Sequence, residues 1–263
     1  MLMIDEDRKD STRRKTMVVV GADGCRGGWL AVLWNDDDWD VQLFPTIDDL
    51  WQSCLGAGLI LLDIPIGLPD GDAPQRACDV EARRRLSPHH HSSVFPPPSR
   101  AALEAASYEE ASAINRSVMG KGLTRQSWGI APKIREVDRL LRRNPRARAI
   151  MRESHPELCF WALNGCSSLP ASKRTGDGQS TREQVLAALI PETRVILRVA
   201  QSRYGRLGAG TDDILDALAL AVTARLGRGS LTAVPGEPIR DAHWLPMEMV
   251  YWSPQPEPAA AGA

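Results

Sequence analysis

The chain has 263 residues, of which 43% are hydrophobic and 25% charged, and its formal net charge at pH 7 is −1. A chain of this length buries enough apolar surface for one large core, so we expect a single folded domain. The near-neutral charge excludes the strongly positive overall field of a general nucleic-acid binder. A local basic face is still allowed, because residues 121–152 carry ten basic side chains against two acidic ones.

Cysteine usage and hydropathy indicate a cytoplasmic protein. Five cysteines without a C-x-x-C pair argue against a disulfide framework and a structural zinc site, which favours a reducing compartment. No apolar stretch approaches the roughly 18–20 residues of a membrane span, so we expect no membrane partner. Residues 1–16 and 253–263 lack hydrophobic periodicity, which predicts disordered tails around a domain at 17–252.

The first part of the chain predicts a β-β-β-α-β order. A β-branched run at residues 17–21 precedes a Gly-rich turn at 23–28 and a second apolar run at 29–34, which is typical of a hairpin. The elements expected next are a strand at 40–45, a helix at 47–54 and a strand at 59–64, which ends before Pro65.

The second part of the chain predicts mainly helices. We expect residues 70–146 to form a helical insertion after the fourth strand. The elements expected in and beyond it are helices at 101–118 and 132–143, a fifth strand at 147–154, a helix opened by a capping box at 181–184, and a last helix capped by Thr211. Together the two parts predict a mixed α/β fold.

Aspartates stand where three of these elements begin or end. Asp23 follows the first strand, Asp63 follows the fourth, and Asp212, Asp213 and Asp216 open the last helix. A carboxylate at the end of a buried strand is costly to desolvate unless it is paired or bound to a metal, so their convergence predicts a divalent-cation site. Each aspartate also has a local interpretation, as a turn residue or as a first-turn residue favoured by the helix dipole.

Other polar side chains could join such a site. His155 and Glu157 follow the expected fifth strand, although Pro156 also favours a plain loop there. Three consecutive histidines at 89–91 invite a metal interpretation, but on an extended chain they cannot all point the same way. The basic residues near position 83 and in the insertion either form a solvated face or contact phosphates.

Seven segments carry a family resemblance. They are GADGCRGGW (21–29), DIPIGLP (63–69), RACDVEAR (76–83), SSVFPPPSR (92–100), KIREVD (133–138), HPELCF (155–160) and DDILDA (212–217). In these segments the chain resembles the domain-of-unknown-function family 429, a group predicted to be RNase H-like nucleases. The resemblance implies an RNase H-like mixed five-stranded sheet flanked by helices, with a helical insertion after the fourth strand.

The resemblance also implies a site and a reaction. Asp23 would bridge two Mg²⁺ or Mn²⁺ ions, Asp63 would hold one of them, and Asp213 or Asp216 the other. The implied activity is hydrolysis of phosphodiester bonds in a nucleic acid or nucleotide. We assign His155 or Glu157 as the proton relay of this reaction. We assign Arg83, Arg85 and Lys133 as phosphate contacts.

The sequence leaves two other functions open. The first is a binding module of the same fold for nucleic acid or a nucleotide, which the three filled acidic positions disfavour. The second is an ATP-dependent phosphotransferase that holds phosphates with Gly24, Gly27 and Gly28. Phosphotransferases of this superfold generally need a duplicated core, and the chain shows one copy.

Overall fold

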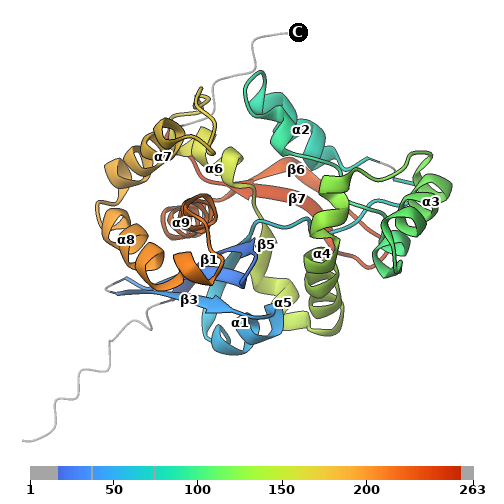
Figure 1. Ribbon diagram of the computed structural model, residues 1–263, viewed down its shortest axis with the longest axis horizontal. Helices are drawn as coiled ribbons and strands as arrows, with labels where there is room; N and C mark the ends of the chain where they lie inside the picture. Colours follow the sequence, from blue (N-terminus) through green and yellow to red (C-terminus); the bar gives the residue numbers. More distant parts are fainter. Residues whose placement is uncertain (1–16, 37, 74, 256–263) are drawn as a thin grey trace, which may run out of the picture.

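The main sheet has five strands in the order β3-β2-β1-β4-β5. Figure 1 labels β1, β3 and β5 of this sheet. The fold is seen in a computed structural model, which describes residues 17–36, 38–73 and 75–255. β1 and β2 are antiparallel, as are β2 and β3, whereas β4 and β5 run parallel to β1 and β4 respectively. The strands are β1 (Val18–Cys25), β2 (Gly28–Trp34), β3 (Trp39–Phe44), β4 (Ala57–Leu62) and β5 (Met151–Glu153).

This architecture confirms the predicted RNase H-like sheet. The β-β-β-α-β order is present, with α1 (Ile47–Ser53) between β3 and β4. One detail differs, because β1 continues through Asp23 to Cys25, which pairs with Gly28. The hairpin turn is therefore at residues 26 and 27, and Asp23 belongs to the strand and not to the turn.

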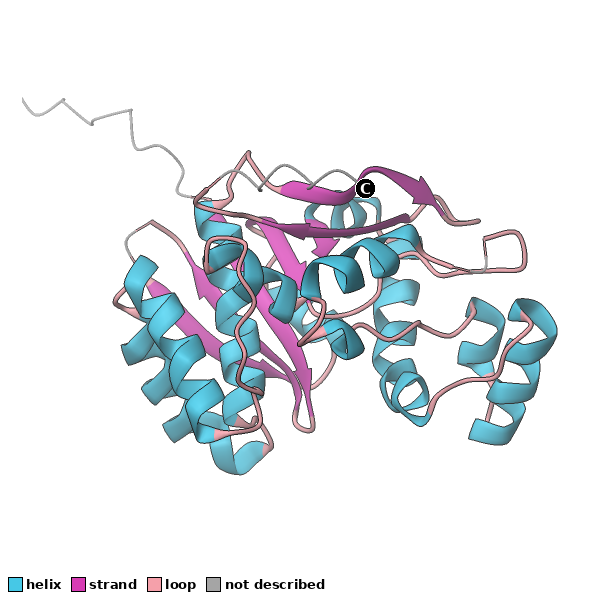
Figure 2. Ribbon diagram, turned by 90° about the horizontal axis from the view of Figure 1, so that it is seen from above, coloured by secondary structure: helices cyan, strands magenta, loops and turns pink. Residues whose placement is uncertain are grey.

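Helices cover both faces of the sheet (Figures 1 and 2). One apolar core lies between the sheet and α6 to α9, and a second lies between the sheet and α1, α4 and α5. α9 is apolar on nearly every side, since every residue from 214 to 224 is buried. The helices around the sheet are α4 (Arg125–Arg143), α5 (Pro145–Ile150), α6 (Pro156–Leu163), α7 (Gly176–Leu189), α8 (Thr193–Tyr204) and α9 (Thr211–Leu226).

The helical insertion lies between β4 and β5, as predicted, but its elements differ from the expected ones. The single helix expected at 101–118 is a 3₁₀ turn and a separate helix, because Ser107 caps a new start at Tyr108. The helix expected at 132–143 begins at Arg125, where the Thr124 hydroxyl caps it. The elements before α4 are α2 (Ala77–Leu86), η1 (His91–Ser93), η2 (Arg100–Glu104) and α3 (Tyr108–Met119).

Three further predictions were wrong in detail. Half of the strand expected at 147–154 is α5, because Asn144 caps a helix that starts at Pro145. The capping-box motif at 181–184 lies inside α7, whose cap is Thr175. The N-cap of α9 is Gly210, and Thr211 is the first helical residue.

A two-stranded sheet ends the described chain. β6 (Thr232–Arg240) and β7 (Pro246–Tyr251) pair as an antiparallel hairpin that packs against α2 and β5. The sequence patterns do not predict this hairpin. Residues 1–16 and 256–263 of the expected tails lie outside the described part of the chain, while the Ser253 hydroxyl still donates to the carbonyl of Ala162 at 3.2 Å. No helix among the described residues is both long and apolar enough to cross a bilayer.

Candidate functional site

Neighbouring parallel strands bring the first two aspartates together. Asp23 lies in β1 and is buried, with 7% of its surface exposed. Asp63 directly follows β4, and its backbone N–H donates to the carbonyl of Ala22 at 3.1 Å, which extends the parallel ladder by one residue. The sheet therefore holds Asp23 and Asp63 beside each other.

The third aspartate, Asp216, lies on α9, and Gly21 allows this helix to approach β1 closely. A Cβ atom on Gly21 would lie 2.1 Å from the backbone nitrogen of Ala221 and 2.5 Å from the carbonyl oxygen of Ala217. Only a residue without a side chain fits there. The close approach places Asp216, in the second turn of α9, over the end of β1.

These three residues form one carboxylate cluster. One carboxylate oxygen from each of Asp23, Asp63 and Asp216 lies within 4.8 Å of the others. Asp213 lines the same cavity, but one of its oxygens accepts the backbone N–H of Gly210 at 2.8 Å and so caps α9. Asp212 lies outside this cavity, in the adjoining hollow beside Gly24 and Gly208. The cluster therefore contains Asp216, and neither Asp212 nor Asp213.

Burial and mutual repulsion disfavour the charged forms of the cluster. Burial, followed by the charges of Asp63 and Asp216, raises the pKa of Asp23 well above its usual range. Burial also raises the pKa of Asp63 to about 6 and that of Asp216 to about 7. Converging carboxylates with raised pKa values are strongly perturbed groups of the kind that concentrate at functional sites.

Lys173 compensates part of this negative charge. Its ammonium group forms an ion pair with Asp216, and its charge lowers the pKa of both Asp63 and Asp216 against the effect of burial. Lys173 lies in the loop before α7, far from the aspartates in sequence, and it is not among the site residues predicted from the sequence. Its neighbours Ser172 and Arg174 show no pattern that distinguishes it from a surface loop residue.

The cluster opens into a cavity of about 310 Å³ between the sheet and the insertion. His155 and Glu157 line it, but they differ in whether another side chain already occupies their polar atoms. Glu157 accepts two hydrogen bonds of 2.7 Å from the guanidinium of Arg182, and both side chains are buried. Burial lowers the pKa of His155, and its Nδ1 atom is buried without a hydrogen-bond partner.

The three basic residues predicted to contact phosphates have different locations. Lys133, on α4, lines the cavity; its ammonium donates to the carbonyl of Gly28 at 2.6 Å and lies 4.7 Å from the ring centre of Trp29. Arg83 lies outside the carboxylate cavity and donates to the carbonyl of Val94 at 2.7 Å. Arg85 also lies outside it and forms an ion pair of 2.6 Å with Glu81.

The donor set of the cluster fits a hard divalent cation. Three aspartates supply carboxylate oxygens, the ligand type that Mg²⁺ and Mn²⁺ prefer. In addition, the Oδ1 atom of Asp216 is buried and has no hydrogen-bond partner among the described residues. Such a buried orphan acceptor is costly unless a cation or a water satisfies it. The residues present therefore fit a bound metal ion.

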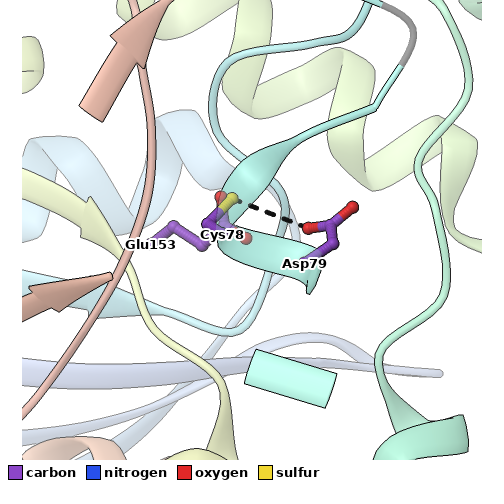
Figure 3. Close-up of side chains that lie close together, drawn as sticks. All are labelled: Cys78, Asp79 and Glu153. Atoms are coloured by element: carbon purple, nitrogen blue, oxygen red, sulfur yellow. Dashed lines mark hydrogen bonds between the residues drawn. The ribbon is translucent and has the colours of Figure 1, made fainter. Parts of the chain in front are cut away.

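A second group of possible ligands, Cys78, Asp79 and Glu153, lies nearby (Figure 3). Here the positive charge is already supplied by Arg76, which forms ion pairs with Glu153 and, at 3.2 Å, with Asp79. Burial raises the pKa of the Cys78 thiol, so it stays protonated, and its sulfur lies 3.6 Å from the Asp79 carboxylate (Figure 3). We interpret this group as a buried ion-pair network that holds α2 against β5.

The order of the five-stranded mixed sheet and the helices that flank it define an α/β protein with an RNase H-like fold. The chain belongs to the family described as "Protein of unknown function (DUF429)", which it matches over residues 21–240. All three aspartates of the cluster fall within the matched region. No curated protein and no solved structure matches the chain.

Proposed function

We propose that the protein is a metal-dependent phosphodiester hydrolase that acts on a nucleic acid or nucleotide, with Mg²⁺ or Mn²⁺ as its metal. The observation that carries this proposal is the cluster of Asp23, Asp63 and Asp216 at the base of a cavity. When bound at such a cluster, two divalent ions activate a water molecule and stabilise the leaving oxygen of a phosphodiester.

Each side chain of the site has a role in this proposal. Asp23 would ligate both ions, while Asp63 and Asp216 would each hold one. Lys173, which forms an ion pair with Asp216, would balance the charge of the carboxylates and would also attract a substrate phosphate.

His155 and Glu157 have separate roles. Burial lowers the pKa of His155, which favours its neutral form, and its Nδ1 has no hydrogen-bond partner among the described residues, so this nitrogen would act as a proton acceptor. Glu157 is held by Arg182 through two hydrogen bonds, which makes it a positioning residue for the start of α6 and not a proton relay.

Hydrolysis of bis(p-nitrophenyl) phosphate and of a labelled oligonucleotide in the presence of Mn²⁺ tests this function. We expect activity that chelation abolishes and that Asp23→Asn lowers by at least about a hundredfold, because an amide is a weaker metal ligand. Asp212→Asn is the matched control, since Asp212 lies outside the carboxylate cavity, and it should keep wild-type activity. Oligonucleotide binding without cleavage of either substrate would instead favour a binding module.

A further inference from the structure

A second cavity of about 350 Å³ adjoins the carboxylate cavity. The two share the side chains that form their common wall, which come from the start of α2 and from the segment Ser92–Phe95 before η2. The shared residues are Arg76, Asp79, Ser92, Val94 and Phe95. The two cavities are therefore direct neighbours.

The second cavity carries an excess of positive charge, in contrast to the first. Its one acidic lining residue, Asp79, is already paired with Arg76. Arg83 donates through Nε to the carbonyl of Val94, and its other nitrogens have no hydrogen-bond partner among the described residues. The ammonium of Lys121 likewise has no ion-pair partner in the described part of the chain. Arg83 and Lys121 are thus available to bind an anionic group.

An aromatic side chain lies at the junction of the two cavities. Phe95 lines both, its side chain is partly exposed, and it belongs to none of the hydrophobic clusters formed by the described residues. A ring that is not used for core packing is free to stack against a planar ligand. Stacking of bases on aromatic rings beside a positively charged groove is the usual basis of single-strand nucleic-acid binding.

We propose that the second cavity is a subsite for the nucleotide next to the scissile phosphate of a single-stranded substrate. Its base would stack on Phe95, and its phosphate would contact Lys121 and Arg83. Both cavities are at the small end of the roughly 300–1,000 Å³ typical of small-molecule sites, so each has the size to hold about one nucleotide. This inference rests on the proposed function for the chemistry at the carboxylates.

Two probes distinguish the subsite from the carboxylate site. Methyl p-nitrophenyl phosphate is small enough to occupy the carboxylate cavity alone, whereas a labelled single-stranded tetranucleotide would fill both cavities. We expect Lys121→Ala to lower kcat/KM for the tetranucleotide at least about fivefold and to leave hydrolysis of the small diester unchanged. Because Phe95 lines both cavities, we expect Phe95→Leu to lower kcat/KM for the tetranucleotide at least about fivefold more than kcat/KM for the small diester. Phe95→Tyr should restore tetranucleotide cleavage, because it keeps an aromatic ring.

The control is Arg198→Ala, which removes an exposed basic residue of α8 remote from the insertion. Metal-dependent cleavage of both probes with no selective effect of the two variants would overturn the subsite while leaving the hydrolase intact. If the wild-type protein cleaves neither probe, its binding of the tetranucleotide is measured by fluorescence anisotropy. Binding that Phe95→Leu and Lys121→Ala weaken would support the subsite without the hydrolase, and absence of binding would overturn it.

Discussion

At the scale of single residues, the site is a balance between three carboxylates and one ammonium group. Asp216 is almost fully buried and would be costly to ionise alone, yet it lies against Lys173. Removing one partner of a buried ion pair leaves an uncompensated charge, which costs more than the pair itself contributes. Lys173 is therefore important for the stability of the metal-free protein, whatever its part in catalysis.

We predict that Lys173→Met destabilises the metal-free protein in a pH-dependent way. At pH 8 the free energy of unfolding should fall by roughly 2 kcal/mol, less than for a fully buried pair because 32% of the Lys173 side chain is exposed. The folded-state pKa of Asp216, about 7, lies above its unfolded value, so ionisation of Asp216 destabilises the fold increasingly as pH rises through 7. The effect of the variant should therefore be smaller at pH 5.

Urea denaturation at the two pH values measures this difference. The control is Arg174→Met, because Arg174 lines the same cavity but is exposed and forms no ion pair among the described residues. Adding Mn²⁺ at pH 8 should restore part of the lost stability, since the metal replaces the missing cation. An equal loss at pH 5 and pH 8, or an equal loss in the control, would contradict this account of Lys173.

At the scale of secondary-structure elements, the site depends on how closely α9 packs against β1. Gly21 is in the middle of β1, and a side chain there would meet the backbone of α9. The backbone of a buried helix cannot move aside as a flexible side chain can. The position of Asp216 relative to Asp23 is therefore set by a residue that is itself outside the cluster.

We predict that Gly21→Ala both destabilises the protein and weakens metal binding. The added Cβ would force α9 away from the sheet, at a cost of about 3 kcal/mol or more, and would separate Asp216 from Asp23. Urea denaturation and Mn²⁺ titration measure the two effects. Gly56→Ala is the matched control, because among the described residues no heavy atom apart from those of its chain neighbours lies within 4 Å of the added Cβ, and it should behave like the wild type. Wild-type metal affinity in Gly21→Ala would show that the close contact does not set the site.

At the scale of the whole molecule, the sequence predicted the parts that depend on local patterns. The β-β-β-α-β order was predictable because each element shows its own periodicity. Asp63 was predictable because it directly follows a strand, whereas Asp23 was expected after the first strand and lies within it. Lys173 and Arg182 were not, because each pairs with an acidic residue 25 or more positions away. The hairpin of β6 and β7 was missed for a similar reason, since α2 and β5, against which it packs, are distant in sequence.

Three separate elements of the molecule meet in one proposed metal site, and calorimetric titration with Mn²⁺ at pH 8 tests that claim most directly. The account predicts saturable binding by the wild-type protein, at least about tenfold weaker binding by Asp216→Asn, and unchanged binding by Asp212→Asn. Absence of binding by the wild type, or equal effects of the two substitutions, would contradict the assignment of Asp23, Asp63 and Asp216 as metal ligands.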